Sequence, residues 1–278
     1  MRPIIKYRGG KTKEIPLFRD YIPTDYDTYY EPFLGGGAVF FHLEPSRAVL
    51  NDLNPKLMAL YSDVRDRYPA VRAQLDALET AYERNQREWE EAKARGESVR
   101  SANETIYYRI RDMYNGKVES EYLPGVLYYY INKTTYVGIL RCNAAGEYNN
   151  SFGGNKHFNT KLLTHAHSDL LQRAELCCGD YRESFRRATE RDFMFLDPPY
   201  GSFTNYGNKD SWGDREHIEL ADEFRRLKCR ALMIIAKSPL TEELYRGFIR
   251  GEYDKKYGCN IKNRFKSAAI HMIVRNYC

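Results

Sequence analysis

A short apolar run that ends in two consecutive prolines constrains the fold of this 278-residue chain more than any other feature. Residues 192–196, Asp-Phe-Met-Phe-Leu, predict a buried strand, and Asp197-Pro198-Pro199-Tyr200 follows it directly. Neither proline has an N–H to donate, so the strand cannot continue through them. The chain must therefore leave the sheet at Asp197, in a rigid loop whose carbonyl oxygens point outward.

The same tetrapeptide carries groups that suit a planar amine. A carboxylate oxygen of Asp197 and the carbonyl of Pro198 can accept both hydrogens of an exocyclic amine, which draws the nitrogen lone pair out of conjugation. Tyr200 can stack on the base that bears this amine. A plain turn after a core strand is the alternative, because such turns also use Asp-Pro. We therefore expect Asp197, Pro198, Pro199 and Tyr200 to be the catalytic residues.

A glycine turn near the amino end predicts a second ligand-binding element. A β-prone run at 29–33 leads into three glycines at 35–37, an apolar stretch at 39–43 and a strand at 48–50 that ends in Asn-Asp52. This outlines a nucleotide-binding βαβ unit, although the turn lacks the spacing of a P-loop. A glycine turn can also serve only to close a strand onto a helix. A carboxylate at Asp52 can accept both ribose hydroxyls, so the combination predicts a nucleoside ligand.

The α/β pattern returns in the second half of the chain. Apolar runs predict strands at 174–178, 231–236 and 271–274, in addition to the one at 192–196. Asp180 follows the first of these runs closely, as Asp197 follows its own strand. Candidate functional residues therefore cluster at the carboxyl ends of strands, where open α/β sheets bind their ligands.

The middle of the chain has a different character. Residues from about 69 to 113 are charged and predict amphipathic helices, with a break near Gly96 and a mostly charged stretch at 84–100. The segment at 123–160 is rich in Tyr, Asn and Gly, and residues 131–165 carry four cations against one acid. Such a surface suits an anionic partner, and a plain polar insertion is the alternative. We predict a catalytic domain at 1–65 and 169–278 around an insertion at 66–168.

Bulk properties restrict the class of protein. The net charge of +5 permits nucleic-acid binding without requiring it. No apolar stretch of about 18 residues and no secretory signal is visible, so we expect a cytoplasmic protein without a membrane partner. The six cysteines form no paired C-x-x-C pattern, so we expect free thiols and no metal site. They are Cys142, Cys177, Cys178, Cys229, Cys259 and Cys278.

Four segments together resemble one enzyme family, the Dam-type (class α) adenine-specific DNA methyltransferases. Residues 6–11, Lys-Tyr-Arg-Gly-Gly-Lys, look like the family's K-[WY]-x-G-G-K segment, and 31–37, Glu-Pro-Phe-Leu-Gly-Gly-Gly, resemble its cofactor loop. Residues 130–149 are similar to its target-recognition segment, and Asp197-Pro198-Pro199-Tyr200 completes the set in the family's order. The resemblance implies a Rossmann-like methyltransferase sheet with an inserted target-recognition domain.

The resemblance also implies a cofactor, S-adenosylmethionine, and residues that bind it. Tyr7 would pack on the cofactor adenine, and Lys11 would bond near its methionine end. Asp52 would hold the ribose, Asp180 would lie by the cofactor base, and Asp197 would face both cofactor and target amine. The matching loop adds four cofactor-binding positions, which are Glu31, Phe33, Gly35 and Gly37.

Double-stranded DNA is the substrate that the resemblance implies, with the target base flipped out of the helix. Lys6 would reach toward a base, Tyr136 would enter the duplex near the flipped base, and Arg141 would read guanine. Lys133 and Asn149 lie in the same matching segment and are further DNA-binding candidates. A cognate restriction endonuclease is a candidate partner.

The chain departs from the GATC-specific members after Asn149. There those members carry a V-P-F-G-R-Y-type run, whereas residues 150–155 read Asn-Ser-Phe-Gly-Gly-Asn, so the resemblance does not extend to a GATC target. Residues 236–238 fit a later family motif only loosely. Residues 201–214, small and polar, are expected to form a lid that orders with DNA.

Three other functions remain open from the sequence. The acceptor could be cytosine N4, or adenine in RNA, since all of these are exocyclic amines; the leading aspartate of the tetrapeptide favours adenine. The chain could be a DNA-binding protein that has the fold without the activity. A generic nucleotide-binding enzyme such as a dehydrogenase is disfavoured, because its glycine pattern differs and it would leave Asp197-Pro198-Pro199-Tyr200 without a role.

Overall fold

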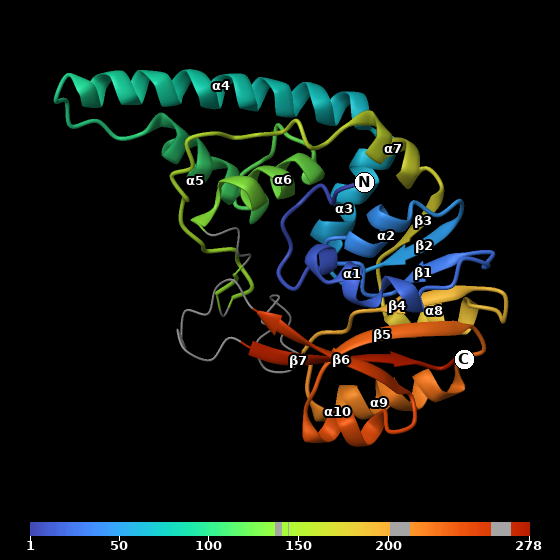
Figure 1. The fold of residues 1–278 in the computed structure, drawn as a ribbon. Coiled ribbons are helices and arrows are strands. Elements are labelled where there is room, and N and C mark those ends of the chain that lie inside the picture. Colours follow the sequence, from blue (N-terminus) through green and yellow to red (C-terminus); the bar gives the residue numbers. More distant parts are fainter. Residues whose placement is uncertain (137–140, 144, 201–211, 257–267) are drawn as a thin grey trace.

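A seven-stranded sheet forms the centre of the molecule, with the strand order β3-β2-β1-β4-β5-β7-β6 (Figure 1). The computed structural model describes residues 1–136, 141–143, 145–200, 212–256 and 268–278. The strands are β1 (Tyr29–Glu31), β2 (Ala48–Asn51), β3 (Ala174–Cys177), β4 (Phe193–Leu196), β5 (Arg230–Ala236), β6 (Ile249–Lys256) and β7 (Ala268–Arg275). The first five pair in parallel, and β7 runs antiparallel to both β5 and β6. The predicted α/β class is confirmed.

Sequence patterns predicted every strand of this sheet except β6 (Ile249–Lys256). Its side chains alternate between half-buried and exposed, and it pairs with β7 alone at the edge of the sheet. A register shift between Ile249 and Gly251 interrupts the pairing further. An edge strand of this kind has no continuous apolar run, so its sequence carries little signal.

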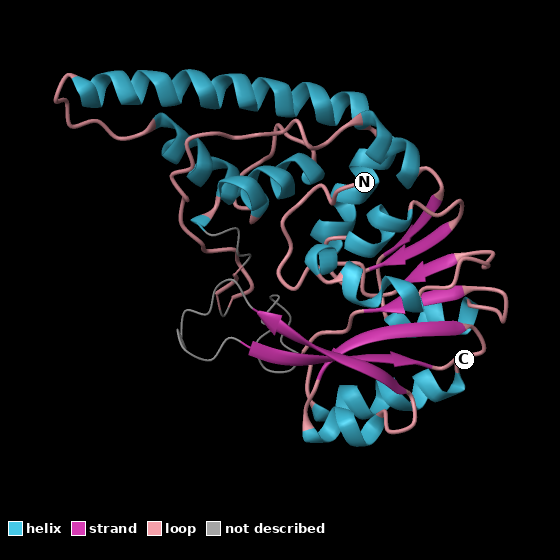
Figure 2. Ribbon diagram, in the orientation of Figure 1, coloured by secondary structure: helices cyan, strands magenta, loops and turns pink. Residues whose placement is uncertain are grey.

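Alternate residues of each strand face two separate cores. Leu50 and Phe195 lie in one core, whereas their neighbours Val49 and Leu196 lie in the other, because successive side chains of a strand point to opposite faces. Helices cover both faces (Figure 2). The first core includes residues of α1 (Ile15–Phe18), α2 (Ala38–Leu43), α3 (Pro55–Asp66) and α7 (His165–Leu171). The second includes residues of α8 (Tyr181–Arg187) and α9 (Asp214–Arg226) and is contacted by α10 (Pro239–Leu244).

The strand order reverses between β1 and β4. The chain winds outward from β1 to β2 and β3, and then returns to place β4 on the other side of β1. At such a switch point the connections leave the sheet in opposite directions and open a crevice at the carboxyl ends of the strands. Glu31 ends β1 and Asp197 directly follows β4, so both lie at this crevice.

Three helices lie between α3 and α7 in the segment that joins β2 to β3. They are α4 (Tyr68–Ala94), α5 (Ala102–Tyr114) and α6 (Pro124–Thr134). The expected break near Gly96 is confirmed, because this glycine has φ +81° and lies where α4 has ended. Figure 1 shows α4 extending well past the sheet. Within the described ranges, no helix combines the length and apolarity needed to span a membrane.

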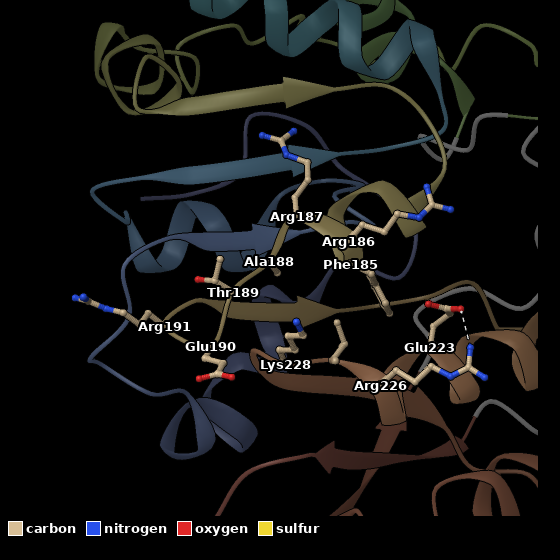
Figure 3. A pocket seen from close by; sticks show the side chains of 11 residues that line it. Phe185, Arg186, Arg187, Ala188, Thr189, Glu190, Arg191, Glu223, Arg226 and Lys228 are labelled. Atoms are coloured by element: carbon tan, nitrogen blue, oxygen red, sulfur yellow. Dashed lines mark ion pairs between the residues drawn. The ribbon is translucent and has the colours of Figure 1, made fainter.

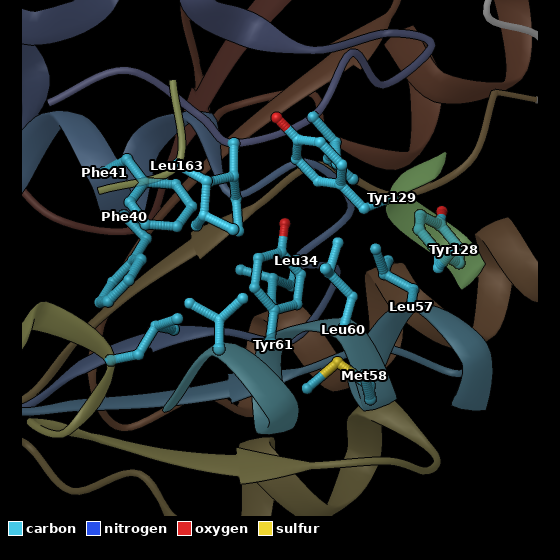
Figure 4. Close-up of a cluster of buried hydrophobic side chains, with 14 of the residues drawn as sticks. Leu34, Phe40, Phe41, Leu57, Met58, Leu60, Tyr61, Tyr128, Tyr129 and Leu163 are labelled. Carbon is cyan, nitrogen blue, oxygen red and sulfur yellow. The ribbon is translucent and has the colours of Figure 1, made fainter. Parts of the chain in front are cut away.

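Helix α6 does not stand apart from the sheet. It packs against α3, and Tyr128 and Tyr129 lie in the same core as Leu34 and Leu57 (Figure 4). Helix α3 itself begins where Asn54 accepts hydrogen bonds from the backbone of the first turn. The domain boundaries expected at residues 66 and 168 therefore stay a prediction, because the core runs continuously across them.

Candidate active site

An ion pair between Lys11 and Asp197 lies at the centre of the crevice. Lys11 Nζ is 2.7 Å from each carboxylate oxygen of Asp197 and donates to the carbonyl of Gly9 at 3.0 Å. The Lys11 side chain is only 2% exposed, so the pair is largely shielded from water. The prolines stop β4 at Leu196, and the short helix Lys11–Lys13 brings the lysine to the loop that follows. Two motifs far apart in the sequence thus meet at one carboxylate.

Tyr200 turns its hydroxyl inward, toward Asp197. The hydroxyl donates to Asp197 Oδ1 and lies 3.4 Å from the carbonyl oxygen of Ile234. Burial, followed by the negative charge of Asp197, raises the pKa of Tyr200 well above its usual value. Lys11 Nζ lies 5.0 Å from the centre of the ring. The expected stacking of Tyr200 on a target base stays a prediction, since the contacts of its hydroxyl are to protein.

The glycine turn packs closely against Tyr7. A Cβ at Gly35 would lie 2.9 Å from Tyr7 Cε1, and one at Gly36 would lie 2.7 Å from Tyr7 Cβ. Gly35 and Gly37 also have positive φ values of +48° and +64°, which side chains disfavour. Gly35 and Gly37 are therefore required for the turn, and Gly35 and Gly36 for the close approach of Tyr7. This places Tyr7 beside the predicted cofactor loop.

Asp52 closes the glycine turn from the neighbouring strand. Its Oδ2 accepts from the Gly35 N–H at 2.9 Å, and its Oδ1 accepts from the Asn54 N–H at 2.9 Å. The Tyr61 hydroxyl donates to the Gly35 carbonyl at 2.9 Å and fixes the other side of the turn. Burial raises the pKa of Asp52 against these hydrogen bonds. Binding of a ribose by Asp52 stays a prediction, and the carboxylate has lone pairs left for it.

Glu31 lies beneath the turn rather than on its surface. It is 2% exposed, and its Oε2 accepts from the Tyr29 hydroxyl at 2.7 Å and from the Phe40 N–H at 3.1 Å. Burial raises the pKa of Glu31 to about 8. In this arrangement Glu31 ties β1 to helix α2. The expected contact of Glu31 with the cofactor stays a prediction.

Phe33 follows β1 and Asp180 follows β3, at the carboxyl ends of these strands. The Phe33 ring centre lies 5.1 Å from that of Tyr181 and 5.6 Å from that of Trp212. Asp180 caps helix α8, because its Oδ1 accepts from the Arg182 N–H at 2.8 Å, and its Oδ2 pairs with the Arg182 guanidinium. The Asp180 side chain is 52% exposed, and its expected place beside the cofactor base stays a prediction.

Asn51 is a residue of this site that pattern reasoning missed. Its buried amide donates to the carbonyl of Pro32 at 3.1 Å and to that of Gly179 at 2.9 Å. One side chain thereby joins the loops that follow β1, β2 and β3. The signal available in the sequence was its place directly before Asp52 at the end of a strand.

The predicted DNA-binding residues lie on the inserted segment and the amino-terminal loop. Lys6 and α6 are joined by two bonds, in which the Lys6 N–H donates to Asn132 Oδ1 at 3.2 Å and Asn132 Nδ2 donates to the Lys6 carbonyl at 2.8 Å. Burial, and then the charge of Lys6, lowers the pKa of Lys133 to about 8. The charges of Lys6 and Lys133 therefore act on each other, and the expected DNA-binding roles of both residues stay predictions.

Arg141 and Asn149 lie opposite each other on a short hairpin. Arg141 Nε donates to Asn149 Oδ1 at 3.2 Å, and an antiparallel bridge joins Cys142 to Tyr148. Tyr136, at the other end of this segment, is 59% exposed. The expected roles of Arg141 and Tyr136 in reading and opening DNA stay predictions.

Asn115 holds this hairpin and was not predicted. Its Nδ2 donates to the Tyr148 carbonyl at 2.9 Å, and its Oδ1 accepts from the Tyr148 N–H at 2.9 Å. The run that departs from the GATC-specific pattern, residues 150–155, is held in a similar way. Thr135 bridges Phe152, and a Cβ at Gly153 would lie 2.7 Å from the Thr135 carbonyl. The backbone of residues 150–155 therefore packs against Thr135, at the end of α6.

Two further expectations concern other parts of the chain. The expected lid at 201–214 falls mostly outside the described residues. Among the described residues, no group of three His, Cys, Asp or Glu side chains is placed to hold a metal ion.

A groove of about 660 Å³ lies at the opposite end of the sheet, between the α8–β4 and α9–β5 connections (Figure 3). Its lining is rich in arginine, but Arg187 pairs with Glu175, Arg191 with Asp27 and Arg226 with Glu223. Their charges are therefore already compensated, and the groove contains none of the residues of the crevice.

Comparison with known proteins gives one consistent family. The sequence model of the family described as D12 class N6 adenine-specific DNA methyltransferase matches residues 7–259. The chain is 32% identical to the Type II methyltransferase M.CviBI of Paramecium bursaria Chlorella virus NC1A, over the full length of both. It is 28% identical to the Type II methyltransferase M1.LlaDCHI of Lactococcus lactis subsp. cremoris, over 100% of this chain and 96% of the relative. With the DNA adenine methylase of Escherichia coli K12 it shares 30% identity, over 74% of this chain and 68% of that protein.

Proposed function

The chain belongs to the D12 class of N6 adenine-specific DNA methyltransferases, and from that premise we propose how its residues divide the reaction. Asp197 and the Pro198 carbonyl bind the target amine, the glycine turn binds S-adenosylmethionine, and the inserted segment binds double-stranded DNA. The observation that carries this proposal is the Lys11–Asp197 pair at the switch point of the sheet. It unites the amino-terminal motif with the Asp-Pro-Pro-Tyr loop at one buried position.

S-adenosylmethionine fits the residues of the crevice. The closely packed turn at Gly35 and Gly36 leaves the Tyr7 ring as one wall, and Asp52 and Asp180 lie at the ends of the next two strands. Two carboxylates suit the hydroxyls and amino group of a nucleoside better than they suit a phosphate. When bound, this cofactor supplies a methyl group on a positively charged sulfur.

Asp197 orients the amine that receives the methyl group. One of its oxygens and the Pro198 carbonyl accept the two N6–H hydrogens, so the nitrogen lone pair points away from the ring plane. Lys11 Nζ bonds both oxygens of Asp197 and the Tyr200 hydroxyl donates to Oδ1, so a lone pair of Oδ2 is left for the amine. After transfer the nitrogen must lose one proton, and Asp197 is the proposed first acceptor for it.

The adenine must leave the duplex to reach Asp197. Flipping a base costs a few kcal/mol, which contacts in the pocket offset. Lys6, Lys133 and Arg141 are the proposed DNA contacts, and the exposed Tyr136 is the proposed residue that enters the helix. Acting on DNA, the enzyme would work in the cytoplasm. Because two relatives bear the name Type II methyltransferase, a cognate restriction endonuclease is a proposed partner.

Transfer of label from radioactive S-adenosylmethionine to duplex DNA tests this proposal. We expect Asp197→Ala to abolish transfer while most DNA affinity remains, because Asp197 is the proposed contact to the reacting amine and the proposed DNA contacts are other residues. Asp27→Ala is the control, since Asp27 forms an exposed pair with Arg191 away from the crevice. Near wild-type transfer by Asp197→Ala would contradict the catalytic assignment.

Mass spectrometry of the nucleosides then identifies the acceptor. We expect N6-methyladenine from DNA, as the family membership states. Label in cytosine, or in adenine of RNA alone, would refute the proposed acceptor. Calorimetry with S-adenosylmethionine separates the cofactor proposal from the DNA proposal, because binding of the cofactor does not require DNA.

A further inference from the structure

A second buried charge cluster lies directly behind Tyr200. Glu14, at the start of α1, is 3% exposed and accepts from His271 Nδ1 at 2.9 Å and from the Tyr253 hydroxyl at 2.8 Å. Lys255 Nζ donates to its other oxygen. Burial by itself would raise the pKa of Glu14, but the bonds from its partners and the charge of Lys11 lower it to about 2. Glu14 is therefore a buried, ionised carboxylate that the reaction described above does not use.

This cluster contacts the catalytic loop through one ring. His271, on β7, is fully buried, and its ring centre lies 5.0 Å from that of Tyr200. Tyr200 in turn donates to Asp197. Its ring thus lies between two fixed partners, His271 on one side and the carboxylate at its hydroxyl end.

The cluster also determines where Lys11 lies. Glu14 comes three residues after Lys11, and its N–H donates to the Lys11 carbonyl at 2.7 Å. One short turn of chain therefore presents Lys11 to Asp197 and Glu14 to His271. A shift of Glu14 would move the backbone that carries Lys11, and a shift of His271 would free the Tyr200 ring.

We propose that Glu14 and His271 are positioning residues for methyl transfer, which hold Tyr200 and Lys11 so that Asp197 keeps its orientation. The inference rests on the proposed function of Asp197. A buried charge network is not needed for stability alone, because apolar residues of similar volume often serve as well or better. The network of Glu14 and His271 instead fixes Lys11 and Tyr200, the two residues that bond to Asp197.

Two substitutions at His271 separate ring position from general stability. His271→Phe keeps a ring beside Tyr200 and removes the donor to Glu14, whereas His271→Asn keeps a donor near the place of Nδ1. We expect kcat of the Phe variant to fall about 10- to 100-fold, because small displacements of reacting groups have effects of that size. KM for DNA and for S-adenosylmethionine should change less than about twofold, and the Asn variant should regain much of kcat.

His167→Asn is the matched control. His167 is also buried, at 4% exposure, but it lies on α7, where Nε2 contacts the Arg2 carbonyl. The proposal would be overturned if His167→Asn and His271→Phe lowered Tm equally and also lowered kcat by the same factor. An unchanged kcat in His271→Phe, or a loss confined to KM, would overturn it as well.

A structural measurement keeps this inference separate from the proposed function. In a crystal structure of His271→Phe, or of Glu14→Gln if that variant does not fold, we expect Tyr200 or Lys11 to shift relative to Asp197. In His271→Asn we expect both to keep their wild-type places. Unmoved side chains in the Phe or Gln variant would overturn the positioning role even if the enzyme proved inactive on DNA. A wild-type protein that fails to methylate would instead refute the proposed function alone.

Discussion

The proposed active-site crevice and the hairpin proposed to read DNA, which carries Arg141 and Asn149, hold their key residues in opposite ways. In the crevice, side chains bond to side chains with little exposure to water, as Lys11, 2% exposed, does to Asp197, 21% exposed. On the hairpin, the backbone is held, as at Tyr148, while Arg141 stays exposed. The pair proposed to orient the reacting amine is held by short ionic bonds with little exposure. The side chain proposed to contact DNA bases is accessible.

The difference also separates the expected effects of mutation. Removing a buried partner leaves an uncompensated charge, which costs several kcal/mol and moves the catalytic group. Removing an exposed side chain costs the protein little and affects only the contact with DNA. Changes in the crevice should therefore abolish the reaction on every substrate, and changes on the hairpin should alter the choice among substrates.

Lys11→Met should give the largest effect. It leaves Asp197 without its counter-charge, and we expect kcat/KM to fall about 1000-fold on any DNA sequence, consistent with a loss of roughly 4 kcal/mol. Steady-state methylation assays measure this directly. Lys13→Met is the control, because Lys13 is exposed two residues further along the chain. Comparable activity of Lys11→Met and Lys13→Met would contradict the expectation that buried partners in the crevice control the reaction.

Arg141→Ala should give the second-largest effect, a loss of preference for the cognate DNA sequence. Loss of a bidentate contact to guanine costs about 1–3 kcal/mol, or roughly 10- to 100-fold in preference for the cognate site. Competition binding with cognate and scrambled duplexes measures the ratio. An equal loss on both duplexes would mean that Arg141 contacts phosphate rather than a base.

Asn115→Ala tests whether the backbone of the hairpin must be held. It removes both hydrogen bonds to Tyr148 without touching an exposed side chain. We expect a decrease of about 5- to 10-fold in discrimination between cognate and scrambled duplexes, since two hydrogen bonds contribute roughly 1–3 kcal/mol together. Binding of S-adenosylmethionine should stay unchanged, as in the control Glu83→Ala, at an exposed position of α4. A loss of cofactor affinity would show that the two regions are coupled.

The smallest effect should come from Lys133, and it should be seen in how DNA affinity depends on pH. Its pKa is lowered to about 8, so its charge is present below that pH and is lost as the pH rises through it. We expect affinity for DNA to fall about threefold more between pH 7 and pH 9 for the wild type than for Lys133→Arg, whose charge persists. Identical pH profiles would exclude Lys133 from the DNA surface.

Local sequence carried much of the site, for reasons that can be stated residue by residue. The prolines at 198 and 199 forbid a longer strand, so Asp197 had to lie at a strand end. Gly35 and Gly37 adopt backbone conformations that side chains disfavour, and this made the turn visible. Glu31 shows the limit of such reasoning. Its position in the motif was clear, but only the packing of α2 over β1 placed it beneath the turn.

The sequence by itself determined the α/β class, the family and the residues of the Asp-Pro-Pro-Tyr loop, because these depend on local backbone constraints and on motifs in a fixed order. The tertiary structure decided which of those residues touch. Lys11 and Asp197 are 186 positions apart, and Glu14 and His271 are 257 apart. No periodicity links such residues. They meet only because the strand order brings the ends of β1, β4 and β5 together beside the antiparallel β7, and the sheet buries their charges there.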